Sequence, residues 1–67
     1  MPELVSRLKE IREARGLTQA QLAETIGVSR KTINTVENGV YVPSTVIALK
    51  LAAVLGTSVE TLFTLAE

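Results

Sequence analysis

Four glycines constrain this 67-residue chain more than any other feature, because they divide it into segments of helical length. They stand at positions 16, 27, 39 and 56, and the stretches between them are rich in Leu, Ala, Glu, Gln, Lys and Arg. This pattern predicts five helices, at about 3–15, 19–26, 30–38, 44–55 and 58–65. The β-favouring residues at 40–42 are too few for a strand, so 40–43 is predicted as a loop. We therefore expect an all-α fold in one domain over residues 1–67.

The composition excludes several classes of function. The chain has no His, no Cys and no Asp, so a zinc centre and disulfides are excluded and the usual catalytic bases are nearly absent. We therefore expect no enzyme activity, no metal and no cofactor. No apolar run reaches the ~20 residues of a membrane span, and residues 1–10 lack the apolar core of a secretory signal. We expect a cytoplasmic protein with no membrane partner.

The second and third predicted helices have the spacing of a helix-turn-helix. The three-residue turn Gly27-Val28-Ser29 joins them. Thr18 and Gln21 fit a capping box at the start of the 19–26 helix, and Ser29 is a good N-cap for the 30–38 helix. A plain helical hairpin has the same spacing, so this pattern favours DNA binding but leaves the hairpin open.

The predicted helix at 30–38 has two unlike faces. Ile33 and Val36 point to one side. The opposite side has no acidic and no apolar residue, and Arg30 precedes it at the start of the helix; it consists of Lys31, Asn34, Thr35 and Asn38. Lys and Arg donate to guanine, Asn pairs with adenine, and Thr contacts thymine. The alternative is an ordinary solvated face, which would usually alternate Glu with Lys.

Arg12 projects onto the apolar face of the 3–15 helix, beside Leu8 and Ile11. A cation that faces a core needs a partner. Glu37 lies on the flank of the apolar face of the 30–38 helix, so we predict a partly buried Arg12–Glu37 ion pair that sets the pose of that helix. In the alternative, Arg12 reaches solvent along the apolar surface.

The last third of the chain is rich in apolar residues. The 44–55 helix is apolar nearly all round, and the 58–65 helix has a broad apolar arc. Four other short helices cannot easily cover both surfaces, and an exposed apolar patch usually marks an interface. We predict a two-fold homodimer whose interface contains Val59, Leu62, Phe63, Leu65 and Ala66. The alternative is that this arc closes the core of the monomer.

Two runs of residues resemble the Cro/CI-type helix-turn-helix family, the phage-repressor-like group also called xenobiotic-response-element regulators. The first run contains Thr18-Gln19, Leu22-Ala23, Gly27-Val28-Ser29, Thr32-Ile33, Val36-Glu37-Asn38-Gly39 and Pro43. The second, Ala48-Leu49-Lys50-Leu51-Ala52, Leu55-Gly56, Ser58 and Leu62-Phe63, is similar to the family's closing two helices. The resemblance covers roughly residues 4–63. It implies a five-helix lambda-repressor-like domain that binds double-stranded DNA, usually as a homodimer on a palindromic operator.

The resemblance also implies roles for single residues. Base contacts are expected from Arg30, Lys31, Thr32 and Thr35, together with Asn34 on the projected polar face. Phosphate contacts are expected from Gln19, Thr18, Ser29, Asn38, Tyr41 and Arg12. Arg12 and Glu37 also match an ion pair of the family. Val40 departs from the pattern, because such proteins often have a basic residue there; either the Tyr41 hydroxyl replaces it or the loop packs against a neighbour.

These patterns together predict a sequence-specific transcriptional regulator, a repressor that occludes promoter DNA as a homodimer on a short inverted repeat. The net charge of zero is compatible with this function, because six of the seven cations lie in the first 31 residues. Two alternatives stay open. One is a module that keeps the fold and binds only protein, and the other is an antitoxin that binds both DNA and a toxin.

Overall fold

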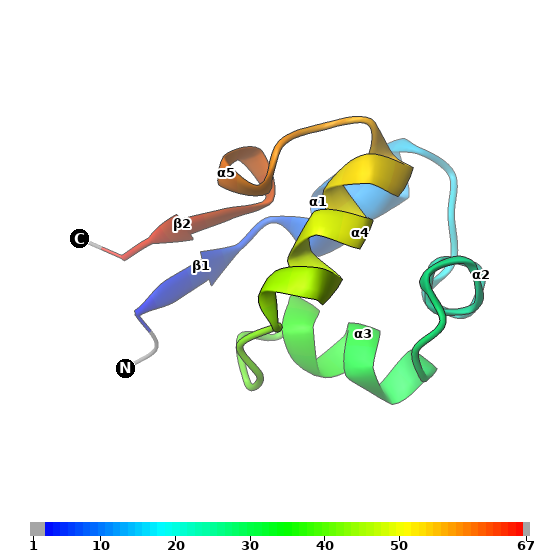
Figure 1. The fold of residues 1–67 in the computed structure, drawn as a ribbon, viewed down its shortest axis with the longest axis horizontal. Helices are drawn as coiled ribbons and strands as arrows, with labels where there is room; N and C mark the ends of the chain where they lie inside the picture. The colour runs from blue at the N-terminus through cyan, green and yellow to red at the C-terminus, as the bar shows by residue number, and fades with distance from the viewer. Residues whose placement is uncertain (1–2, 67) are drawn as a thin grey trace.

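The structure is a computed structural model that describes residues 3–66 (Figure 1). Its elements are β1 (Leu4–Ser6), α1 (Leu8–Ala14), α2 (Gln19–Ile26), α3 (Arg30–Glu37), α4 (Thr45–Leu55), α5 (Val59–Leu62) and β2 (Phe63–Leu65). The two strands come from opposite ends of the chain and lie side by side at one end of the molecule, while α2 lies at the other end. The predicted five-helix architecture, with α2 and α3 as the helix-turn-helix, is confirmed.

Side-chain hydroxyls define where most of the helices begin. In α2, α3, α4 and α5 the N-cap hydroxyl accepts a hydrogen bond from a backbone N–H of the first turn, and the four N-caps are Thr18, Ser29, Ser44 and Ser58. Such a bond satisfies one of the N–H groups that a helix start leaves without a partner. The starts of these four helices were predictable because the caps are local signals.

The helical prediction was wrong at both ends of the chain. Residues expected to extend the first and last helices instead form a two-stranded antiparallel sheet, with the register Leu4↔Leu65, Val5↔Thr64 and Ser6↔Phe63. The backbone N–H of Arg7 donates to the Leu62 carbonyl at 2.8 Å, directly where α1 and α5 adjoin the strands. Because the two strands are about sixty residues apart in the chain, helical periodicity within either segment carries no sign of their pairing.

One core joins all five helices. Its fully buried side chains come from every helix and are Leu8, Leu22, Ile33, Val36, Leu51, Leu55 and Leu62. The helix α4 packs against both α2 and α5. It buries Ala48, Leu51, Ala52 and Leu55 on one face and leaves Val46, Leu49 and Val54 exposed. The monomer therefore uses only part of the apolar surface that the sequence predicts for this helix.

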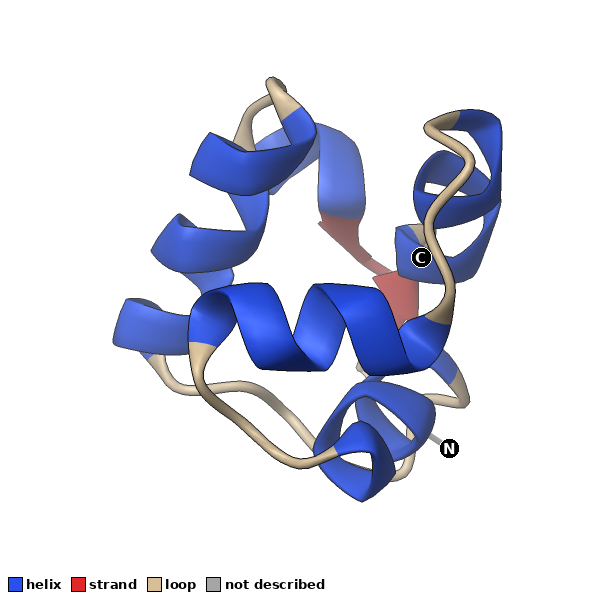
Figure 2. Ribbon diagram, turned by 90° about the vertical axis from the view of Figure 1, so that its right-hand side faces the viewer, coloured by secondary structure: helices blue, strands red, loops and turns tan. Residues whose placement is uncertain are grey.

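The described residues have extents of 31 × 22 × 20 Å. Viewed from the α2 side, the strands lie behind the helical part of the molecule (Figure 2). Among residues 3–66, no helix has the length and apolar character needed to cross a membrane.

Candidate nucleic-acid interface

Local hydrogen bonds define the start of α2 and the short turn Gly27–Ser29 between α2 and α3. Thr18 and Gln21 form the predicted capping box, with the Gln21 N–H donating to Thr18 Oγ1 at 3.0 Å and the Thr18 N–H donating to Gln21 Oε1 at 2.8 Å. Gly27 ends α2 in the left-handed conformation, with φ of 78°. Ser29 then begins α3 by accepting a hydrogen bond from the Thr32 N–H at 3.2 Å. The angle between the two helices is therefore set by local bonds at both sides of the turn.

Arg30 and Lys31 project from the first turn of α3 into solvent. Neither side chain has a hydrogen bond or an ion pair within residues 3–66, whereas other cations of the chain serve helix ends. Arg15 Nε donates to the Leu55 carbonyl at 3.0 Å, and Lys50 Nζ donates to the Ile26 carbonyl at 3.4 Å. Arg30 and Lys31 are therefore available for a ligand at the start of α3.

The hydroxyls of Thr32 and Thr35 are turned toward their own helix. Thr35 Oγ1 donates to the carbonyls of Lys31 and Thr32, both at 3.0 Å. Thr32 Oγ1 lies 3.0 Å from Ser29 Oγ. Because the single hydroxyl proton of Thr35 is shared between these carbonyls, Thr35 presents its methyl group and its oxygen lone pairs to a ligand.

Arg12 and Glu37 form the ion pair that the helical projection predicts. Arg12 Nε lies 2.6 Å from Glu37 Oε2, Arg12 Nη2 lies 3.3 Å from Glu37 Oε1, and Arg12 Nη1 donates to the Leu17 carbonyl at 2.7 Å. The two side chains are only 9% and 2% exposed. Hydrogen bonding to Glu37 raises the pKa of Arg12 against the lowering effect of burial, so the guanidinium stays charged. The pair holds α3 against the end of α1.

Arg12 has a structural role in this geometry, while it also lines the hollow at the start of α2, so its phosphate contact stays a prediction. All three nitrogens of its guanidinium already donate within the molecule, and little of the side chain reaches the surface.

Gln19 extends the same network, which sequence reasoning did not find. Its Nε2 donates to Glu37 Oε1 at 2.9 Å and to Asn34 Oδ1 at 3.2 Å. Asn38 Nδ2 donates to the same Asn34 oxygen at 3.3 Å. The available signal was the spacing of Asn34, Glu37 and Asn38, which places three polar groups on one flank of α3.

A hollow of about 420 Å³ lies at the start of α2 and reaches Arg30. Its lining includes Leu17, Thr18, Gln19 and Ala20. No hydrogen bond within the described part of the chain uses the backbone N–H of Gln19 or Ala20, the first two residues of α2. These N–H groups, rather than the Gln19 side chain, are free to bind an anion.

The loop after α3 is tied to the helix by its backbone. The N–H groups of Val40 and Tyr41 donate to the Thr35 carbonyl at 3.0 and 3.2 Å. Tyr41 is 44% exposed and, with Lys31 and Thr35, lines a small hollow of about 300 Å³ beside α3. The loop prediction is confirmed, and Tyr41 lies close to Lys31, since both line this hollow.

The residues expected in a dimer interface are not all accessible. Leu62 is fully buried and Phe63 is 7% exposed, so both belong to the core of the monomer, and their prediction as interface residues was wrong. Val59 is half-buried, whereas Leu65 and Ala66 are exposed. The alternative, that this arc closes the monomer core, holds for Leu62 and Phe63.

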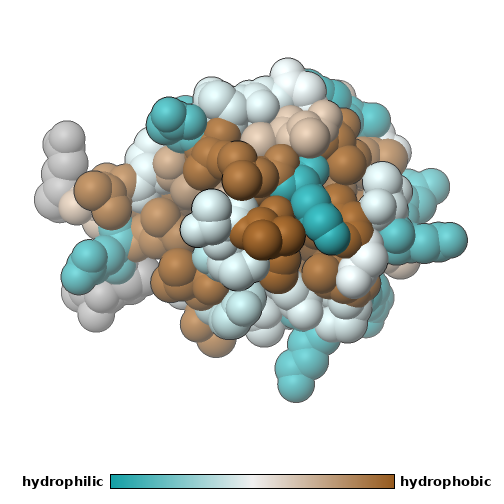
Figure 3. All heavy atoms as spheres, viewed as in Figure 1, coloured by the Kyte–Doolittle hydropathy of each residue, from teal (hydrophilic) through white to brown (hydrophobic). Residues whose placement is uncertain are grey.

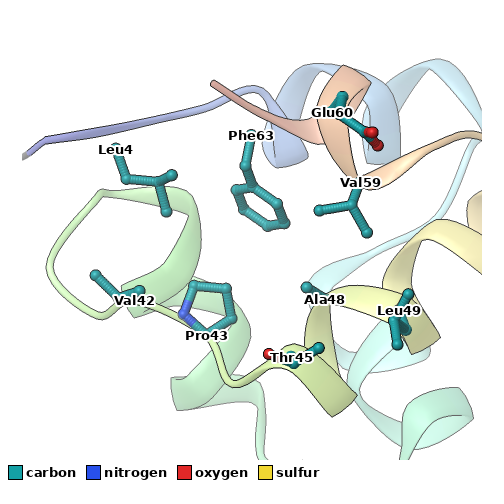
Figure 4. Close-up of a pocket in the computed structure, with 9 residues that line it drawn as sticks. All are labelled: Leu4, Val42, Pro43, Thr45, Ala48, Leu49, Val59, Glu60 and Phe63. Atoms are coloured by element: carbon teal, nitrogen blue, oxygen red, sulfur yellow. The ribbon is translucent and has the colours of Figure 1, made fainter. Parts of the chain in front are cut away.

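Other apolar side chains are exposed, and in Figure 3 brown surface gathers over α4 and the strands. They include Val42 at 69%, Val46 at 62%, Leu49 at 57% and Leu65 at 75% exposure. Val42 and Leu49 line a groove of about 440 Å³ (Figure 4). Leu4, Phe63 and Val59 line one side of it, and Pro43, Thr45 and Ala48 line the other.

Comparisons with known proteins agree with this geometry. A family model described as Helix-turn-helix matches residues 8–62, which contain all five helices and neither strand. YgzD of Bacillus subtilis, described as an uncharacterized HTH-type transcriptional regulator, is 40% identical over 62 residues, covering 92% of this chain and 94% of YgzD.

Two solved structures are also similar. The restriction-modification controller protein C.AhdI of Aeromonas hydrophila has a TM-score of 0.75 and 41% identity, covering 81% of this chain and 82% of that one. SinR of Bacillus subtilis, described as the master regulator for biofilm formation and solved in complex with DNA, has a TM-score of 0.76 and 34% identity, covering 82% of this chain and 89% of that one.

Proposed function

The chain belongs to the Cro/CI-type helix-turn-helix family of DNA-binding transcriptional regulators, and we propose that it reads one specific operator through α3. The observation that carries the proposal is the outward face of α3. There Arg30 and Lys31 lack an acidic partner within the described chain, while the Arg12–Glu37 pair holds the helix from behind. A rigid helix with free donors at its first turn suits the edges of bases in the major groove.

The proposed contacts divide into two sets. Arg30 and Lys31 donate to base edges, with Thr32, Asn34 and Thr35 beside them on the same helix. The phosphates on either side are held by the first N–H groups of α2, including that of Gln19, and by polar side chains around the turn and the loop, namely Thr18, Ser29, Asn38 and Tyr41. Base contacts set sequence preference and phosphate contacts set position.

We also propose that the protein binds as a homodimer. A standard interface buries ~800 Å² on each partner, close to a fifth of the 4392 Å² that this monomer exposes. The groove of Figure 4 supports such an interface, because the exposed apolar side chains of Val42 and Leu49 line it. Recognition helices on successive major grooves are ~34 Å apart, and two adjoining copies of a molecule 31 Å long allow that separation.

Repression is the simplest regulatory outcome of this arrangement. A dimer that covers two half-sites one helical turn apart excludes other proteins from the same stretch of promoter DNA. Its place of action is the cytoplasm, where the DNA is.

The proposal is tested first by the salt dependence of binding to bulk duplex DNA. Each phosphate contact made by a cation releases counterions, so the logarithm of the association constant falls linearly with the logarithm of salt concentration. We expect a measurable but shallow negative slope, because few cations face the ligand. Absence of any DNA binding at low salt would contradict the proposal.

A second candidate is a function in which a protein partner, such as a toxin, binds the same chain. The exposed Val40, Tyr41 and Val42 next to α3 favour it, since a phosphate-binding loop would more often be basic. Co-expression of this chain with the products of neighbouring genes, followed by a pull-down, distinguishes the two candidates. A captured partner that displaces DNA supports the protein-binding function, and DNA binding with no such partner supports the operator-reading function.

A further inference from the structure

A chain of side-chain hydrogen bonds runs from the core to the outer face of α3, and the charges at its inner end fix its direction. The Arg12 guanidinium can only donate, and the Glu37 carboxylate can only accept. Gln19 lies 2.9 Å from Glu37 Oε1. The Gln19 atom at that contact must therefore be the nitrogen Nε2, since an oxygen there would face a carboxylate oxygen.

The same constraint passes from Gln19 to Asn34. Gln19 Nε2 uses its second proton toward Asn34 at 3.2 Å, so the Asn34 atom that it meets must be the acceptor, Oδ1. Asn38 Nδ2 donates to this oxygen as well, at 3.3 Å. An amide oxygen has two lone pairs, and both are now in use.

The nitrogen of Asn34 is left for a ligand. Asn34 is exposed, and no hydrogen bond of its Nδ2 is found within residues 3–66. Its two protons are available, while its oxygen is not. The amide thus faces outward as a donor only.

We infer that Asn34 contacts DNA as a hydrogen-bond donor only, and that Gln19 is the positioning residue that imposes this. The inference rests on the proposed function. A bidentate contact to adenine needs a free acceptor for the N6 amino group and a free donor for N7. Asn34 lacks the acceptor. Its partners are atoms that accept: N7 and O6 of guanine, O4 of thymine, N7 of adenine through a single bond, or a phosphate oxygen.

The test is selection of bound sites from a random duplex library, followed by sequencing, with the wild-type protein, Asn34→Ala and Asn34→Asp. If Asn34 contacts a base, we expect guanine or thymine at one position of each half-site. In Asn34→Ala the enrichment of that base over the others should fall about tenfold. Asn34→Asp replaces the donor by an acceptor, so the preference should move to cytosine or adenine. For a phosphate contact, Asn34→Ala should weaken all sites alike and leave the sequence preference unchanged.

Either of those two results supports donor-only binding and tells the two ligand atoms apart. A preference for adenine over guanine that disappears in Asn34→Ala would overturn the inference, and so would an Asn34→Ala variant with unchanged affinity and preference. If the wild-type protein selects no site at all, the proposed function has failed rather than this inference.

A measurement on the free protein keeps the inference testable if a variant folds poorly. In ¹⁵N spectra, the Gln19 side-chain amide protons should exchange slowly with solvent, and those of Asn34 should exchange fast. The variant Gln19→Met removes both donors, and it should raise the share of adenine at the Asn34 position several-fold. Slow exchange at Asn34, or an unchanged selection with folded Gln19→Met, would contradict the role of Gln19.

Discussion

Glu37 is the residue on which the position of α3 depends. Its carboxylate accepts hydrogen bonds from Arg12 of α1 and Gln19 of α2 while it stands on α3, so three helices meet at one side chain. A nearly buried ion pair of this kind is weak proof of stability by itself, because desolvation offsets much of the attraction. Removing one partner is strongly destabilising, because the other charge then stays buried without a counter-charge.

We therefore predict that Glu37→Gln lowers the free energy of unfolding by roughly 3 kcal/mol. The substitution keeps the shape of the side chain and removes the charge that balances Arg12. Urea denaturation measures the effect, and the exposed Glu24→Gln on α2 is the matched control, expected to change stability by less than about 0.5 kcal/mol. A loss below about 1 kcal/mol for Glu37→Gln would mean that the pair behaves as an ordinary surface ion pair.

At the same scale, Lys31 should read a base rather than contribute only charge. Lys31→Ala should cost roughly 1–3 kcal/mol at the preferred site and relax the preference at one position of each half-site. Lys9→Ala removes an equal charge from an exposed position on α1 and should leave the preference unchanged. Fluorescence anisotropy on the selected site and on single-base variants makes the comparison. Identical effects of the two substitutions would remove Lys31 from the base contacts.

At the scale of the elements, the turn between α2 and α3 depends on the backbone of Gly27. Its φ of 78° lies in the left-handed region, and no atom lies within 4 Å of where a Cβ would stand. The only penalty for a side chain is therefore conformational. We predict that Gly27→Ala lowers the free energy of unfolding by about 1 kcal/mol and that Gly27→Asn costs less, because Asn tolerates this conformation. Equal losses in thermal or urea melts would point to a steric cause instead.

The elements also show where sequence reasoning succeeds and where it stops. The starts of α2 and α3 follow from Thr18 and Ser29, whose caps are local, and the Arg12–Glu37 pair follows from projecting two helices separately. The strands could not be found in this way, because Leu4–Ser6 becomes a strand only through Phe63–Leu65. The role of Gln19 was missed for the same reason: its partners lie on another helix, and their contact depends on how α2 and α3 cross.

At the scale of the whole molecule, the apolar surface is larger than the core of one chain uses. Leu62 and Phe63 are taken up inside the monomer, while Val42, Val46 and Leu49 remain outside. The groove of Figure 4, which Val42 and Leu49 line, has neither Arg30 nor Lys31 in its lining. In the proposed homodimer, a second copy that covers this groove need not contact Arg30 or Lys31.

We predict that Leu49→Lys converts the protein to a monomer and weakens operator binding at least tenfold. In a two-fold interface the same apolar surface of each copy contacts that of the other. A lysine at position 49 would therefore be buried against apolar side chains with no acidic partner. Val54→Lys, on another side of α4 and 40% exposed, is the control and should leave the dimer intact. Sedimentation equilibrium measures the molecular mass. A wild-type protein that is monomeric at all concentrations up to the millimolar range would contradict the dimer.

Two copies of α3 are proposed to read an inverted repeat, and sequencing of sites that the wild-type protein selects from a random duplex library measures this. The predicted result is enrichment of a short palindrome whose half-site centres are ~10 base pairs apart. Enrichment of a single asymmetric site, or of no site although the protein is folded, would contradict it.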